Sequence, residues 1–224
     1  MISRLQRKHL TIVSNKKFNT LRIRKLIILS VFFIFFILLV KAIYDSKIKV
    51  TVADTYPVPV LQDFLDPNPY SRPQTKLVKV EGIVIHYVAN PGTTASANRD
   101  YFNKISDRYA SSHFIVGLDG EIVQCIPLDE IAYASNDRND NTIAIECCHP
   151  DSSGKFNKAT YNSLIRLTAW LCGKYDVPKK NIIRHYDVNG KMCPLYYVKH
   201  EKKWNKLKDD VFDYIRENAI SDDD

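Results

Sequence analysis

A run of fifteen apolar residues, interrupted only by Ser30, is the strongest constraint that this sequence places on its fold. The run extends from Leu26 to Val40, and apolar residues continue to Tyr44 beyond Lys41. Crossing ~30 Å of hydrocarbon takes ~20 helical residues at ~1.5 Å each. The segment is just long enough if the Lys41 ammonium reaches the interface. We therefore predict one N-terminal transmembrane helix over residues 26–44.

The basic residues of the chain are concentrated in front of this run. The protein has 224 residues, 32 Lys and Arg against 25 Asp and Glu, and a formal net charge of +7. Residues 1–25 contain eight of the bases and no acid, so the rest of the chain carries a net charge of −1. The body of the protein therefore has no bulk attraction for phosphate backbones, and we expect no nucleic-acid partner.

The same basic cluster predicts the orientation of the helix, because clustered Lys and Arg stay on the cytoplasmic side. We expect a single-pass protein of the cell membrane, with residues 1–25 as a cytoplasmic tail and the remainder outside. A cleavable signal peptide is the alternative, and it predicts a secreted protein. Its apolar region is usually ~7–15 residues long and ends in a small-x-small site. Val40–Ile43 makes a poor site of that kind.

Beyond the apolar run the sequence divides into a tether, a domain and a short tail. Residues 45–75 hold five of the ten prolines, which favours an extended tether. Within it, Val60–Leu65 is apolar enough to pack on the domain. Residues 76–218 have the length and pattern of one domain with a single core. Residues 219–224 form an acidic C-terminal tail.

Short apolar, β-branched runs alternate with helical patterns in this domain. Two helices are predicted from their apolar stripes, Lys158–Tyr175 with Asn157 as N-cap, and Glu201–Asn218. Leu118–Gly120 predicts a hairpin turn, and hence an antiparallel pair. The expected fold class is α/β, with a mixed central β-sheet flanked by helices. The predicted strands are Gly82–Val88, His113–Gly117, Glu121–Ile126, Thr142–Cys147 and Asn181–Arg184.

The stretch HYDVNGKMCP, which follows the last predicted strand, is the most informative one for chemistry. It reads as a polar loop that holds His185 and Cys193, and imidazole and thiolate are both zinc ligands. His86 interrupts another buried strand and is the candidate for a third ligand. Each signal alone is weak, because a buried histidine is more often simply hydrogen-bonded in the core.

Glu146 interrupts a further buried strand, where a carboxylate is costly unless it is paired or functional. The alternative is a strand-end carboxylate that faces solvent. Together with His86 and His185, it stands at the end of a predicted core strand, and sites of parallel sheets lie at such ends.

These residues belong to a pattern that resembles a known family. The segment from about Val80 to Ile215 is similar to the zinc-dependent N-acetylmuramoyl-L-alanine amidases of the type 2 amidase family, which share their fold with peptidoglycan recognition proteins and bacteriophage amidase lysozymes. The resemblance is carried by four motifs: IVIHYVANPGTTA, ASSHFIVGLDGEIVQCIP, TIAIECC and HYDVNGKMCP. It implies a peptidoglycan hydrolase that cleaves the amide between N-acetylmuramic acid and L-alanine of the stem peptide.

Carried over by position, the resemblance implies Zn²⁺ held by His86, His185 and Cys193. It places proton transfer on Glu146 and oxyanion stabilisation on Lys191. Where one branch of the family has a tyrosine, this sequence has Ser112, which gives Glu146 more weight. The alternative function is a membrane-tethered, non-catalytic peptidoglycan receptor or scaffold. Such members of the fold typically lack the cysteine ligand, so the presence of Cys193 favours an enzyme.

The remaining polar residues have less specific interpretations. We expect His113 to be buried and hydrogen-bonded, with a role beside the metal as the alternative. Asp187 and Asn189 can orient His185 or cap the loop, and His149 is expected at the surface.

A covalent Cys-His nucleophile is the rival chemistry for Cys193. The other four cysteines are expected to be buried small hydrophobes, with a disulfide as the alternative: Cys125, Cys147, Cys148 and Cys172.

Overall fold

The computed structural model describes residues 26–40 and 59–218. The predicted basic tail, residues 41–44 of the predicted span, residues 45–58 of the predicted tether and the acidic tail lie outside the described residues. The chain divides into two compact units, Met1–Ile48 and Lys49–Asp224.

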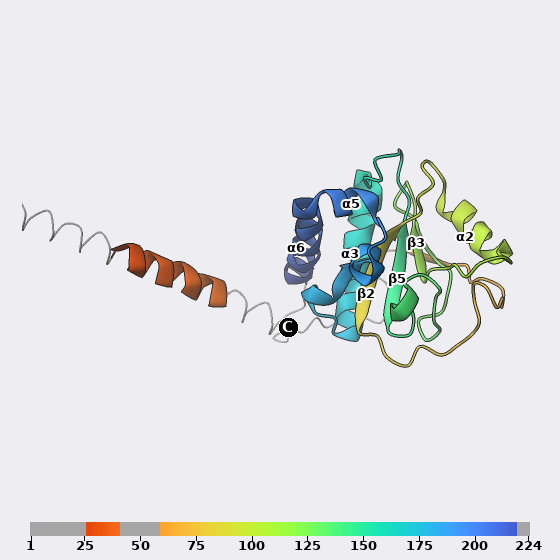
Figure 1. Cartoon of the computed structure of the whole chain (residues 1–224), viewed down its shortest axis with the longest axis horizontal. Coiled ribbons are helices and arrows are strands. Elements are labelled where there is room, and N and C mark those ends of the chain that lie inside the picture. The colour runs from red at the N-terminus through yellow and green to blue at the C-terminus, as the bar shows by residue number, and fades with distance from the viewer. Residues whose placement is uncertain (1–25, 41–58, 219–224) are drawn as a thin grey trace, which may run out of the picture. The chain divides into compact units, whose positions relative to one another are not determined.

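In the first unit, residues 26–40 form a helix (red-orange in Figure 1). The hydroxyl of Ser30 donates a hydrogen bond to the carbonyl of Ile27 at 2.8 Å, so the single polar side chain of the run is satisfied within the helix. Fifteen residues of helix rise only about 22 Å. Among the described residues, no helix has both the length and the hydropathy that crossing a membrane requires.

The second unit is built on a six-stranded sheet of order β1-β4-β3-β5-β2-β6. Only β3 and β4 pair antiparallel, through the hairpin predicted at Leu118–Gly120; the other neighbours run parallel. This confirms a mixed sheet. The strands are β1 Val60–Gln62, β2 Gly82–Tyr87, β3 Phe114–Val116, β4 Ile122–Gln124, β5 Thr142–Cys147 and β6 Ile182–Arg184.

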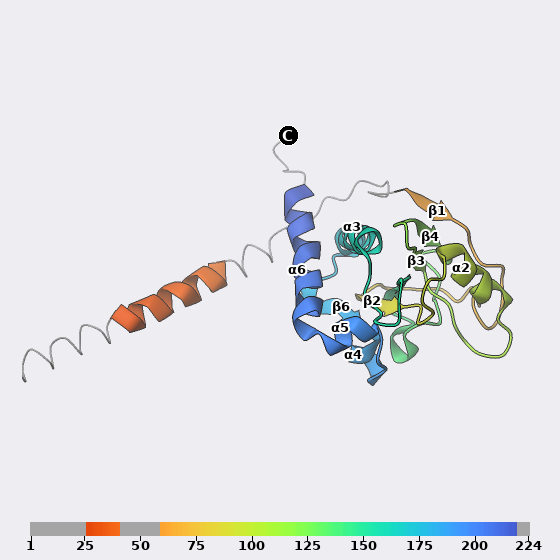
Figure 2. The same ribbon diagram turned by 90° about the horizontal axis from the view of Figure 1, so that it is seen from above.

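Helices cover both faces of this sheet. Figures 1 and 2 show α3 against one face with α6 outside it, and α2 on the other side of the sheet, beside β3. Asn157 caps α3 by accepting a hydrogen bond from the amide of Thr160, worth about 1 kcal/mol. The helices are α2 Ala95–Lys104, α3 Lys158–Tyr175, α4 His185–Asn189, α5 Leu195–Lys199 and α6 Glu201–Asn218, with short 3₁₀ turns η1 Asn136–Arg138 and η2 Lys179–Asn181.

The packed domain begins earlier than the boundary predicted at residue 76. β1 adds to the sheet beside β4, Leu65 is fully buried, and Arg72 forms a two-bond ion pair with Glu130 at 2.7 and 2.8 Å. Residues 59–75 are therefore part of the domain. The prolines of this segment all lie outside β1, so none of them interrupts its pairing with β4.

Candidate active site

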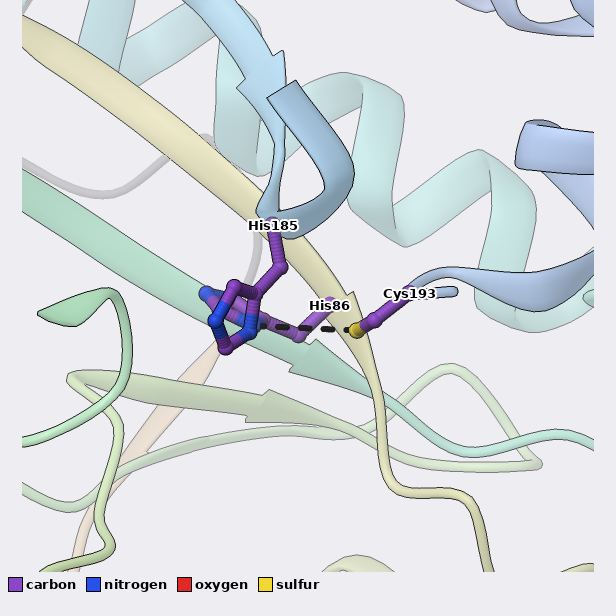
Figure 3. A group of neighbouring side chains, drawn as sticks. All are labelled: His86, His185 and Cys193. Carbon is purple, nitrogen blue, oxygen red and sulfur yellow. Dashed lines mark hydrogen bonds between the residues drawn. The ribbon is translucent and has the colours of Figure 1, made fainter. Parts of the chain in front are cut away.

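Three side chains from separate elements meet at the carboxyl end of the parallel strands. His86 stands near the end of β2, His185 opens α4 directly after β6, and Cys193 lies in the loop after α4. Because β2 and β6 are parallel neighbours, the two histidines arrive at the same edge of the sheet. Figure 3 shows the three side chains directed at one another. All three are buried, and one potential ligand atom of each lies within 4.8 Å of the others.

The two histidines present the same nitrogen to this point. Their Nδ1 atoms are 3.1 Å apart, and Cys193 Sγ lies 3.8 Å from His86 Nδ1. The opposite nitrogens are engaged: His86 Nε2 with the hydroxyl of Ser135 at 3.1 Å, and His185 Nε2 with Asn136 Oδ1 at 2.9 Å. When Nε2 carries the proton in both rings, two Nδ1 lone pairs face each other. A cation bound by these two nitrogens and the Cys193 thiolate would remove the repulsion between the lone pairs. Two imidazoles and a thiolate are donors that suit zinc.

Burial controls the charge of these donors. It lowers the pKa of His86 well below its usual value, further lowered by His185 and Lys191, and it lowers the pKa of His185 to about 4. Both rings are therefore neutral at physiological pH, as metal ligation requires. Burial also raises the pKa of Cys193 to about 12, so the thiol is protonated until a cation displaces the proton.

Glu146 lies directly beside His86, as its register partner on β5. Within the described residues its Oε2 is shielded from solvent and has no hydrogen-bond partner. Burial raises the pKa of this carboxyl to about 8, against an opposing effect of the Lys191 ammonium. An unsatisfied buried carboxylate oxygen is costly, and beside three convergent donors it marks a functional site.

A cleft of about 250 Å³ opens onto these groups, and Glu146, His185 and Lys191 all line it. Lys191 is exposed in the loop after α4, where its amide donates a hydrogen bond to Asn189 Oδ1 at 3.1 Å. Tyr109 and Tyr133 line the far part of the cleft, with ring centroids 5.0 Å apart. The structure therefore places Glu146, His185 and Lys191 on one cleft, with His86 and Cys193 buried next to His185.

Of the three residues considered for supporting roles, Asn189 lies beside His185, with its Nδ2 3.3 Å from His185 Nε2, whereas His113 and Asp187 bond elsewhere in the described structure. Buried His113 bonds to the carbonyl of Glu130 and to the amide of Ala144. Asp187 binds Arg184, through the backbone amide at 2.8 Å and the guanidinium at 2.7 Å. His113 is thus hydrogen-bonded in the core, as expected, and Asp187 bonds to Arg184 rather than to His185. Asp187 instead caps α4, which is why the stretch predicted as a loop begins with a helix.

The residues that orient the two ligand histidines are Ser135 and Asn136, and the sequence analysis missed both. Asn136 adopts a positive φ of 50° and accepts a second hydrogen bond at Oδ1 from Asn189 Nδ2, 2.9 Å away. Asn139 supports the turn by accepting from the amide of Ser135 at 2.6 Å. The run of Asn and Asp over residues 136–141 could have indicated a tight turn here, because Asn tolerates left-handed backbone in such turns.

The other singled-out side chains fall in the core. His149 is buried, not at the surface, because its ring packs against Tyr87 with centroids 5.1 Å apart, and Nδ1 meets the carbonyl of Asp151. The four cysteines outside the candidate site, Cys125, Cys147, Cys148 and Cys172, are free and buried, as expected for small hydrophobes.

Comparisons with known proteins agree with this geometry. The Amidase_2 family, described as N-acetylmuramoyl-L-alanine amidase, matches residues 76–195. The N-acetylmuramoyl-L-alanine amidase CwlL of Bacillus licheniformis is 32% identical over 180 residues, covering 73% of this chain and 49% of CwlL. A probable N-acetylmuramoyl-L-alanine amidase of the same organism is 35% identical over 179 residues, covering 73% and 50%. This chain thus spans about half the length of these relatives.

Solved structures show the same similarity. A mutant endolysin from Bacillus subtilis is 31% identical with a TM-score of 0.60, and the match covers 69% of this chain and 99% of the endolysin. The catalytic domain of XlyA is 30% identical with a TM-score of 0.60, with the same coverage.

Proposed function

The chain belongs to the Amidase_2 family of N-acetylmuramoyl-L-alanine amidases, and on this premise we propose that its domain hydrolyses peptidoglycan at the amide between N-acetylmuramic acid and L-alanine. The observation that carries the proposal is the convergence of His86, His185 and Cys193 beside Glu146, on a cleft that substrate can enter. A peptidoglycan receptor has no need for a buried acid with an unsatisfied oxygen, so this arrangement favours cleavage over binding alone.

We infer that the cation of this site is zinc, held by His86 Nδ1, His185 Nδ1 and Cys193 Sγ. Three protein donors are the number found in catalytic rather than structural zinc sites. Zinc, when bound, supplies a Lewis acid that polarises the amide carbonyl and lowers the pKa of the attacking water. Ser135 and Asn136 hold the two imidazoles in the tautomer that directs Nδ1 inward.

The chain's own residues move the protons and meet the developing charge. Glu146 accepts a proton from the attacking water and passes it to the amine nitrogen of the departing L-alanine. The ammonium of Lys191, on the same cleft, faces the negative oxygen that forms when the carbonyl becomes tetrahedral. The walls of the cleft orient the muropeptide between these groups.

The test uses the full chain in nonionic detergent with purified peptidoglycan. We expect new N-terminal L-alanine without new reducing sugar ends, because the amide and not the glycan is cut. A chelator abolishes the release and added zinc restores it. Release that survives the chelator would instead favour a covalent Cys-His nucleophile. Intact muropeptides that bind tightly without release would indicate a receptor.

We also propose that the protein is held in the cell membrane by residues 26–44, with residues 1–25 in the cytoplasm and the amidase domain outside. The support is the apolar run, the eight bases before it and the poor cleavage site after it. Protease added to intact cells should degrade the domain and leave a membrane-bound fragment that starts at the N-terminus. A soluble product that lacks these residues would contradict the anchor and indicate cleavage and secretion.

A further inference from the structure

A second hollow, of about 440 Å³, lies apart from the catalytic cleft and shares none of its lining residues. We call it the lysine pocket, defined by Lys155, Lys158, Lys203 and Lys206 around the rings of Phe156 and Tyr196. Its walls come from the loop after β5, the first turn of α3, α5 and the first half of α6. Figure 1 shows α5 beside the ends of α3 and α6 where these elements meet.

The acidic residues of the lysine pocket are already engaged within the protein. Asp210 accepts hydrogen bonds from the hydroxyl of Tyr161 and from Lys206 Nζ, each at 2.7 Å. Asp151 accepts from the amide of Ser153 at 2.9 Å in its own turn. The partner of Asp151 is a neutral amide, so Asp151 keeps its negative charge, and the four lysines and two aspartates leave the pocket a net charge of +2 for a ligand.

The surroundings of those lysines add to their preference for an anion. Lys155 Nζ lies 5.8 Å from the ring centre of Tyr196, so its side chain extends along the aromatic wall. Asn157 and Lys158, at the positive end of the α3 dipole, also line the pocket. The domain over residues 59–218 has a net charge of only +1, so the lysines are concentrated at the pocket.

The kind of anion follows from the residue types. The cationic side chains of the pocket are lysines, and no arginine is among the described residues that line it. Lysine ammoniums act as point charges, which suits phosphate oxygens. Aromatic walls pack against the carbon faces of a sugar or polyol. A recess of this size takes a projecting group rather than a flat charged surface such as a membrane.

We propose that the lysine pocket binds a phosphodiester polymer, a chain of sugar or polyol units joined by phosphates, while substrate occupies the catalytic cleft. Tyr196 follows the candidate ligand Cys193 by only three residues, so the two sites lie on either side of one short segment. An envelope polymer seated there would hold the domain on wall regions that carry it. This goes beyond cleavage, since binding is independent of turnover.

The experiment measures binding of a fluorescent glycerol phosphate hexamer to the full chain in nonionic detergent at low salt. The double variant Lys158→Gln/Lys203→Gln should bind about tenfold more weakly than the matched control Lys180→Gln/Lys202→Gln, whose exposed lysines lie outside the pocket. Both variants should hydrolyse polymer-free peptidoglycan at the rate of the unchanged protein. Equal hexamer affinities for the two variants would overturn the proposal.

Two further probes distinguish the source of the anion. A hexamer of glutamate, which has similar charge but carries carboxylates, should bind at least tenfold more weakly than the phosphate hexamer. Equal binding would reduce the pocket to a non-specific charge effect and overturn the assignment. Glycerophosphoglycerol represents a single lipid headgroup. If it binds as tightly as the hexamer, the pocket recognises a headgroup and the polymer assignment is wrong.

Discussion

The domain buries histidines in two settings, and the contrast between them separates structure from function. His113 has both ring nitrogens engaged by the backbone, at Glu130 and Ala144. His86 and His185 each have one nitrogen engaged by a side chain, while the other points to a shared position beside Cys193. Burial lowers the pKa in both settings, so a shifted pKa does not identify the site. What identifies the site is that several donor atoms without a protein partner of their own point to one position.

The largest effect is expected from removing the thiol of the convergent set. Cys193→Ser replaces a thiolate with a hydroxyl, a much poorer zinc ligand, and should lower bound zinc from about one per chain to under ~0.1 after dialysis. Metal analysis by mass spectrometry gives the ratio. The matched control is Cys172→Ser, a buried cysteine in α3 outside the cluster, which should keep its zinc. One zinc per chain in Cys193→Ser would remove Cys193 from the ligand set.

Glu146→Gln should separate metal binding from catalysis. The amide fills the same space and leaves the three donors intact, but it does not accept and return a proton, so turnover should fall ~10³-fold at unchanged zinc content. Release of N-terminal alanine from peptidoglycan measures the rate. Glu217→Gln, on the exposed end of α6, serves as control. A near-normal rate for Glu146→Gln would assign proton transfer to another group.

The fully bonded histidine should instead affect the pH dependence of stability. Burial holds the folded-state pKa of His113 at about 4, below its ordinary 6.5. The unfolded chain therefore binds the proton more readily, and the stabilising contribution is complete above pH 6.5 and lost as pH falls toward 4. This contribution of His113 to the free energy of unfolding amounts to at most roughly 3 kcal/mol.

Urea unfolding of the full chain in nonionic detergent, followed by tryptophan fluorescence, tests this contribution. The free energy of unfolding of His113→Gln should fall less between pH 7 and pH 4 than that of the unchanged protein, and its zinc content should stay at one. Parallel pH curves for the two proteins would show that His113 does not titrate as its burial predicts. Loss of zinc in His113→Gln would contradict the interpretation of His113 as a structural histidine separate from the metal site.

The smallest effect concerns the orientation of His185. Asn136→Ala removes the acceptor of its Nε2 proton and should weaken zinc affinity about tenfold. Asn136→Asp keeps an acceptor oxygen and should restore most of it, whereas a purely structural role in the turn predicts no such rescue. Competition with a chromogenic chelator measures the affinity, with Asn162→Ala on the surface of α3 as control. Unchanged affinity in Asn136→Ala would remove Asn136 from the site.

Local patterns were sufficient for much of the fold. The strand Thr142–Cys147 and the helices Lys158–Tyr175 and Glu201–Asn218 have the predicted bounds, because continuous apolar runs and single apolar stripes depend little on distant contacts. β1 was not predicted as a strand, since its pairing with β4 joins segments about 60 residues apart and only its burial decides the outcome. The Asp187 cap likewise converts a polar loop into α4.

The residues of the candidate site likewise fall into those that the sequence predicted and those that it did not. His86, His185, Cys193 and Glu146 were singled out as reactive side chains in unusual sequence contexts, and the family resemblance joined them into one site and added Lys191. Ser135 and Asn136 are ordinary turn residues there, and only the three-dimensional position of the two imidazoles gives them significance. His149 looked like a surface residue beside Pro150 and Asp151, but stacking on Tyr87 buries it.

The adjacency of β2 and β6 also determines when this domain becomes complete. The two histidines are 99 positions apart in the chain, and the strand that delivers the second is the last one of the sheet and lies at its edge. A chain still emerging, or cut before β6, has His86 but nowhere to assemble the centre. The order of the sequence thus delays assembly of the candidate site until about the final fifth of the protein, which contains β6 and Cys193, has folded into place.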